Sequence, residues 1–128
     1  MKRKEAREYV VLKAFEIDAN NSWDESPEKW LGDKELGGQR SYVLNVLGKL
    51  SEERDNIDGI INSVSDKWTT GRMARTDLAI IRVAAAEMLY IEDVPKAVAI
   101  NEAVELSKKY GTEESGRFIN AILGKIDA

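Results

Sequence analysis

The sequence of 128 residues contains no cysteine and no histidine. Without cysteine the chain has neither a disulfide nor a thiolate metal site. Without histidine a zinc site would have to use carboxylates alone, which is uncommon. The same absences exclude Ser-His-Asp and Cys-His catalysis. Because the sequence also lacks a phosphate-binding glycine loop and any other nucleophile–base pair, we expect neither an enzyme nor a bound cofactor.

Long hydrophobic runs are absent as well. No apolar stretch at the N-terminus resembles a signal peptide, so we expect a cytoplasmic protein that does not associate with a membrane. The most apolar segment, Leu78–Ile91, is too short and too interrupted to cross a bilayer. The net charge of −4 argues against a surface that binds nucleic acid everywhere, but it is compatible with a local basic patch.

The segment Leu78–Ile91, with the sequence LAIIRVAAAEMLYI, is predicted to be the central helix of an all-α domain. A helix that is apolar nearly all round must be covered by protein on most sides. We expect Thr76 to cap its start and Asp77 to lie at the positive end of the helix dipole. Ala84 and Ala85 should be fully buried, since small residues let neighbouring helices approach.

Arg82 and Glu87 carry the only charges within this apolar segment. Buried ionisable groups can mark a catalytic site. These two residues are five positions apart, however, and do not face each other on a helix. A lone buried arginine would be costly, so we expect each to pair with another helix, for example Arg82 with Glu102 or Glu105.

Apolar spacing and capping signals predict about seven helices in total and no sheet. Before the central helix we expect a first helix of about four turns ending near Asn20-Asn21 and a short helix Pro27–Leu31 capped by Ser26. A helix from Gln39 to Leu50 and a helix capped by Ser51, whose apolar stripe ends at Trp68, complete the first half. After the central helix we expect a helix with Pro95 in its first turn, closed by Gly111, and a last helix capped by Thr112 with the core stripe Ile119, Ile122, Leu123 and Ile126.

Two features are candidates for binding nucleic acid. One is a cluster of cations in the first one and a half turns, which is either a solvated, frayed terminus or a phosphate-contacting arm. The other is Phe118, which lies about 90° from the centre of the last core stripe. It either packs against a neighbouring helix or presents a face on which a base can stack. The cations are Lys2, Arg3, Lys4 and Arg7.

Several segments, in the right order and spacing, resemble the NusB family. The most specific lie in the C-terminal half, and the similarity is weakest over Asn21–Gly38. The matching segments are DLAIIRVAAAE at Asp77–Glu87, Val94-Pro95, AINEAVEL at Ala99–Leu106, KKYG at Lys108–Gly111, SGRFINAIL at Ser115–Leu123, and, in the first helix, Ala6-Arg7-Glu8 with Leu12, Ala14 and Phe15.

The resemblance implies an all-α fold of two packed helical subdomains, which we place at residues 1–68 and 72–128 of a single domain, 1–128. It implies a transcription antitermination factor that pairs with NusE, a small-subunit ribosomal protein, binds the boxA element of nascent ribosomal RNA leaders and joins RNA polymerase. The partner would dock near Asp77. The alternative function is a helical protein-interaction domain without RNA binding. The implied RNA contacts are Lys2, Arg3, Lys4, Arg7, Ser115, Arg117 and Phe118.

Overall fold

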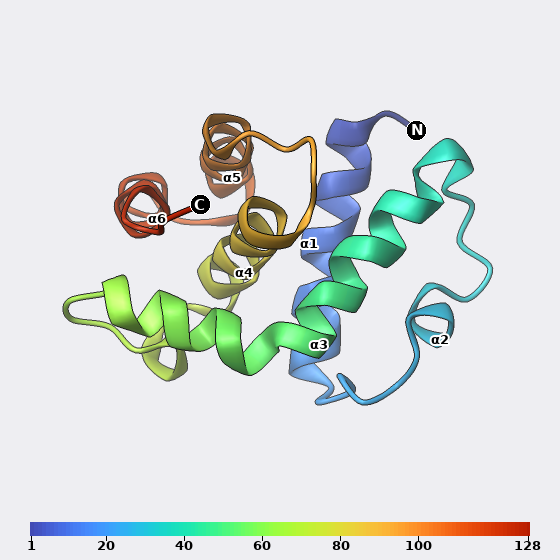
Figure 1. The fold of residues 1–128 in the computed structure, drawn as a ribbon, viewed down its shortest axis with the longest axis horizontal. Coiled ribbons are helices and arrows are strands. Elements are labelled where there is room, and N and C mark those ends of the chain that lie inside the picture. The colour runs from blue at the N-terminus through green and yellow to red at the C-terminus, as the bar shows by residue number, and fades with distance from the viewer.

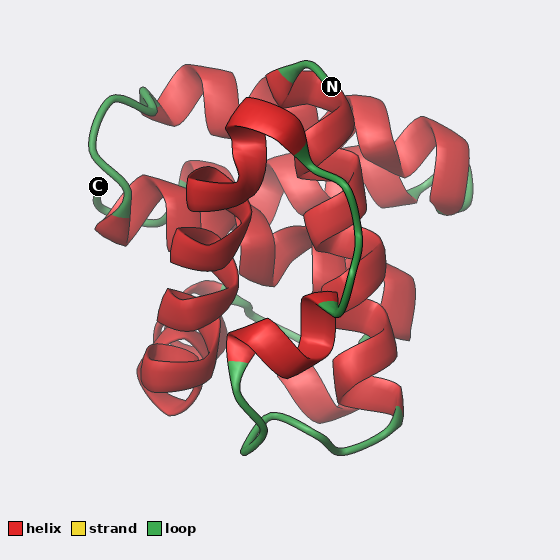
Figure 2. Cartoon of the chain, turned by 90° about the vertical axis from the view of Figure 1, so that its right-hand side faces the viewer, coloured by secondary structure: helices red, strands yellow, loops and turns green.

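The computed structural model describes all 128 residues and contains helices and loops but no strand (Figures 1 and 2). This confirms the predicted all-α class. No helix is both long and apolar enough to cross a membrane. The elements are α1 (Arg3–Ala19), α2 (Pro27–Leu31), the 3-10 turn η1 (Gly37–Gln39), α3 (Arg40–Val64), the 3-10 turn η2 (Thr70–Arg72), α4 (Arg75–Tyr90), α5 (Lys96–Tyr110) and α6 (Ser115–Gly124).

Helix α4 is the centre of the fold, as predicted. Every residue from Asp77 to Glu87 is buried, and α4 contacts α1, α3, α5 and α6 (Figure 1). Ala84 and Ala85 are buried, which confirms their predicted place in the core. The apolar surface of α4 on all sides is therefore covered by four neighbouring helices.

The start of α4 differs from the prediction. The helix begins at Arg75, with Ala74 as its N-cap residue and no capping side chain. The prediction that Thr76 caps the helix is therefore wrong, because Thr76 already lies within the first turn. Asp77 also lies in the first turn, as predicted, where the positive end of the helix dipole stabilises its charge.

The middle of the chain forms one helix rather than two. Helix α3 runs through a kink at Glu53, whose φ and ψ are −109° and 16°. Ser51 does not cap a new helix; its hydroxyl donates to the Trp23 carbonyl at 2.9 Å. Leu50 and Ile57, on either side of the kink, are both buried in the same core, so the helix bends and continues. The structure therefore has six α-helices where about seven were predicted.

The end of α3 also differs from the prediction. The helix stops at Val64, and Trp68 lies beyond it with 45% of its surface exposed. Trp68 is thus not part of an apolar stripe in the core. The segment after Val64 instead leads through η2 into α4, because the chain must turn there to bring α4 back against α3.

A single cluster of buried apolar side chains extends from Ala6 to Ile126. It includes Ile119, Ile122, Leu123 and Ile126, the predicted core stripe of the last helix. The division into two subdomains stays a prediction. Ser26 caps α2 as predicted, since its hydroxyl accepts from the Lys29 backbone N–H at 3.2 Å.

Arg82 pairs with other helices, as expected, but with different partners. Its guanidinium donates to both oxygens of Asp58 on α3, at 2.9 and 2.7 Å, and lies 3.1 Å from Asp18 on α1. The predicted partners Glu102 and Glu105 are wrong, because this face of α4 is covered by α1 and α3 and not by α5. The guanidinium of Arg82 thus links α4 to both α3 and α1.

Candidate nucleic-acid interface

The N-terminal cations begin the first turn of α1, and Lys2, Arg3 and Lys4 are exposed. Two of them are oriented by neighbours. The Arg3 guanidinium lies 4.0 Å from the centre of the Tyr42 ring and donates from Nε to Gln39 at 2.7 Å. The Lys4 ammonium lies 3.0 Å from Glu102 on α5. The arm is therefore helical and held against α3 and α5 while its charges remain accessible.

Arg7 lies in a different place from that expected of a phosphate-contacting arm. Its side chain is buried, and its guanidinium donates to both carboxylate oxygens of Glu87, at 2.8 and 2.9 Å. Burial lowers the pKa of Arg7, but the hydrogen bonds and the charge of Glu87 outweigh this effect and raise it above its ordinary value. Arg7 is thus a buried cation whose donors are satisfied within the protein.

Three of the expected site residues meet at the start of α6. Asp77, Ser115 and Phe118 line one hollow of about 230 Å³ between the η2–α4 segment and α6. Phe118 is half-buried, packed on the core along one side and facing the hollow with the other. Trp68 lines the same hollow, with the Arg72 guanidinium 5.3 Å from the centre of its ring. The hollow therefore combines two aromatic side chains with charged groups.

Asp77 supplies an unsatisfied acceptor at this hollow. Only 9% of the residue is exposed, and its Oδ1 is buried without a hydrogen-bond partner in the chain. A buried acceptor without a donor destabilises a protein by about 1–3 kcal/mol, and more when it is charged. Asp77 therefore has one carboxylate oxygen at the hollow that can still accept a hydrogen bond.

Ser115 shapes the loop that precedes α6. Its side chain is buried, and its hydroxyl accepts from the Thr112 backbone N–H at 2.9 Å. The predicted capping role of Thr112 is wrong, since the helix begins at Ser115 with Glu114 before it. A Cβ on Gly111 would lie 2.4 Å from the Ser115 hydroxyl, so this close approach requires glycine. Ser115 and Gly111 together hold the loop against the end of α5.

Arg117 points away from the other residues at the start of α6. It is exposed and lines a separate hollow between α5 and α6, together with Glu102, Glu105 and Asn120. Glu102 is also the partner of Lys4 and accepts from Arg7 at 3.2 Å. The face of α5 that carries Glu102 thus lies between the N-terminal arm and Arg117.

Sequence reasoning did not single out Trp68 or Glu102 as site residues. Trp68 fitted the period of an apolar stripe, and Glu102 had the pattern of an ordinary surface charge. Nothing in the sequence alone distinguishes them, because both acquire their place from contacts between distant segments.

Comparisons with known proteins agree with this architecture. Residues 4–128 match the model of the NusB family. The transcription antitermination protein NusB of Acetivibrio thermocellus is 40% identical over 128 residues, covering 98% of this chain and 88% of the relative. That of Geobacillus kaustophilus is 38% identical over 129 residues, covering 100% of this chain and 97% of the relative.

A solved structure shows the same fold. NusB of T. maritima superposes with a TM-score of 0.86 at 29% identity, over 98% of this chain and 89% of that one. The curated relatives are transcription antitermination proteins and not enzymes, which confirms the expectation of a non-enzymatic protein. On this evidence, the chain belongs to the NusB family of transcription antitermination proteins.

Proposed function

We propose that this protein binds the boxA element of nascent ribosomal RNA leaders together with NusE, and joins RNA polymerase in the cytoplasm as part of an antitermination complex. The observation that carries the proposal is the hollow at the start of α6, where Phe118 and Trp68 lie beside the unpaired carboxylate oxygen of Asp77. Aromatic faces suit unpaired bases, and an unpaired acceptor suits a protein partner.

The RNA contact is assigned to the face of Phe118 that lines the hollow. Single-stranded RNA is recognised largely by stacking of splayed bases on aromatic side chains. Arg117, Lys2, Arg3 and Lys4 are exposed cations that can meet the phosphates. The buried Arg7 and Ser115 hold the arm and the α6 loop in place, and neither needs to touch the RNA itself.

The partner contact is assigned to Asp77. A backbone N–H or a cationic side chain of NusE would satisfy its Oδ1, which has no donor within the chain. A hydrogen bond to a charged group contributes about 1.5–3 kcal/mol. Docking at this position also places the partner next to Phe118, so that both proteins can contact one RNA strand.

The decisive variant for RNA binding is Phe118→Ala, with Val98→Ala, an exposed apolar residue on α5, as the control. Binding of a labelled single-stranded leader RNA containing boxA is measured with NusE present. Phe118→Ala should lose roughly 1–3 kcal/mol of RNA affinity, the usual contribution of one stacked base. NusE binding should not change. The free energy of unfolding of the Phe118→Ala variant should fall by less than the approximately 3–5 kcal/mol expected for a fully buried phenylalanine.

Asp77→Asn tests the partner contact separately. It should weaken NusE binding while the salt-dependent affinity of the free protein for RNA stays the same. If the wild-type protein binds NusE but shows no salt-dependent RNA binding with or without it, the alternative holds. The protein would then be a helical protein-interaction domain.

A further inference from the structure

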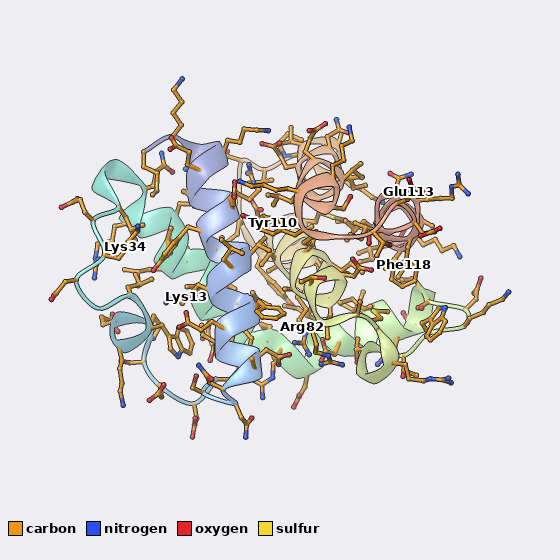
Figure 3. The ribbon with its side chains drawn as sticks, turned by 180° about the vertical axis from the view of Figure 1, so that it is seen from behind. Lys13, Lys34, Arg82, Tyr110, Glu113 and Phe118 are labelled. Carbon is orange, nitrogen blue, oxygen red and sulfur yellow. The ribbon has the colours of Figure 1, made fainter.

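A charged groove lies between α1 and α5, outside the hollow at the start of α6. Its volume is about 420 Å³, and its lining is almost entirely charged. Figure 3 shows α1 in front with Tyr110 beside it, and Phe118 on the same face of the molecule where α6 begins. The lining residues are Lys4, Arg7, Glu8, Glu102, Glu105, Leu106, Lys108 and Lys109.

The three lysines of this groove are paired with carboxylates of the same groove. Lys4 lies 3.0 Å from Glu102, and Lys108 lies 3.1 Å from Glu105. Lys109 lies 2.6 Å from Glu8, which connects the end of α5 to α1. The carboxylates therefore occupy the positions at which the phosphates of a nucleic acid would meet these cations.

The pairs remain open to exchange, because the lysine side chains are 62–70% exposed. Ion pairs at such exposed positions are worth at most about 1 kcal/mol. A backbone phosphate of RNA has two unesterified oxygens that share one negative charge, so it can replace a carboxylate as the acceptor of a lysine hydrogen bond. Its binding also releases counterions from the RNA. A strand of RNA can therefore displace the carboxylates from the lysines at low cost.

The contact between Glu8 and Lys109 also involves the Tyr110 side chain. One carboxylate oxygen of Glu8 accepts from both the Lys109 ammonium and the Tyr110 hydroxyl. These hydrogen bonds lower the pKa of Glu8 and raise the pKa values of Lys109 and Tyr110. Tyr110 directly precedes the loop that leads to Ser115 and Phe118. The pair thus lies on the path between the arm and the start of α6.

We infer that the α1–α5 groove carries the RNA backbone from the N-terminal arm to Phe118, and that Glu8 blocks Lys109 until a phosphate replaces it. This inference rests on the proposed RNA-binding function. Helices α4 and α5 both lie between α1 and α6 (Figure 1), and a strand that runs from the arm to Phe118 along the α5 side passes this groove. The carboxylates then weaken binding to any RNA that does not also engage Phe118 and the partner.

The test compares Lys109→Gln and Glu8→Gln with a matched ion pair elsewhere. The side chains of Glu25, just before α2, and Lys29, within α2, are 2.7 Å apart and about as exposed as those of Glu8 and Lys109. Helix α2 lies near the end of α1 that is opposite the N-terminal arm (Figure 1). Glu25→Gln and Lys29→Gln therefore change the net charge equally without touching the groove. Affinity for the labelled boxA leader RNA is measured over a range of salt concentrations, and thermal melts confirm that each variant is folded.

Lys109→Gln should weaken RNA binding about threefold to tenfold relative to Lys29→Gln. Its salt slope should fall by about 0.7, the value for one phosphate contact to a single strand. Glu8→Gln should strengthen RNA binding by a similar factor relative to Glu25→Gln, because Lys109 no longer has to leave a charged partner. A purely structural role of Glu8 would instead leave affinity unchanged or lower it.

The two proposals fail in different ways. If Phe118→Ala loses RNA affinity but the groove variants match their controls, the groove does not carry the backbone and the proposed function stands. If Glu8→Gln weakens binding, the blocking role is overturned. If the wild-type protein binds no RNA with NusE present, the proposed function fails and the groove inference with it.

Discussion

Arg7 on α1 and Glu87 on α4 form a two-point ion pair inside the protein, although eighty positions separate them in the sequence. Glu87 is completely buried, and both of its oxygens accept from the guanidinium, at 2.8 and 2.9 Å. The remaining Arg7 nitrogen reaches Glu102 on α5. This one arginine therefore fixes three helices at the base of the N-terminal arm.

Removing Arg7 should destabilise the fold strongly. Arg7→Met leaves the buried charge of Glu87 without a partner, and breaking such a pair by losing one member costs about 3–5 kcal/mol. The double variant Arg7→Met/Glu87→Met should recover much of that loss, because no charge is left buried. Urea denaturation of the two single variants and the double variant measures the effect. A loss below about 1 kcal/mol for Arg7→Met would show that the pair is solvated.

Enlarging the centre of α4 should also be costly. Ala85 is fully buried where four helices approach α4. Ala85→Leu should overpack the site and lower the free energy of unfolding by about 1–3 kcal/mol. The denaturant midpoint reports the change, and Ala97→Leu, at an exposed position on α5, is the control. An unchanged midpoint for Ala85→Leu would contradict the central position of the helix.

The exposed arm should affect RNA binding and not stability. Arg3→Ala combined with Lys4→Ala should weaken binding of all single-stranded RNAs alike and flatten its salt dependence. Each lost phosphate contact lowers the slope by about 0.7. Fluorescence titrations at several salt concentrations measure this slope, with Lys29→Ala as the control. Should affinity and slope both stay at the wild-type values, the arm is only a solvated terminus.

Acid should weaken the junction of α1 with α4. Burial raises the pKa of Asp18, but the hydrogen bond from Trp23 and the charge of Arg82 outweigh it, so the folded pKa lies below the ordinary value of about 3.9. The stabilisation is therefore complete above about pH 5 and is lost progressively as the pH falls through the ordinary value and then through the folded pKa.

Asp18→Asn checks this pH dependence. The variant should be less stable than the wild type at neutral pH, and the difference should shrink as the pH falls below about 4. Asp33→Asn, at an exposed loop position, provides the control. Stability is measured by thermal melts at a series of pH values. A difference that does not change with pH would show that the charge of Asp18 does not stabilise the fold.

Much of the helical framework was predictable from local pattern. The apolar run of α4, the Ser26-Pro27 start of α2 and the core stripe of α6 all follow from residues close together in the chain. The wrong predictions for Ser51 and Trp68 have one cause. Ser51 and Trp68 fit a local capping or stripe pattern, but contacts with distant segments decided their positions.

The sequence by itself determined the all-α class, the central helix and the family, since these depend on periodicity and on motifs read along the chain. Only the tertiary structure decided which charges are free. Arg7 and Arg3 look alike in the sequence, yet one is buried against Glu87 and the other is exposed on Tyr42. The physical reason is that the free energy of a charged group depends on the groups that surround it in space, and packing brings those groups together from distant parts of the chain.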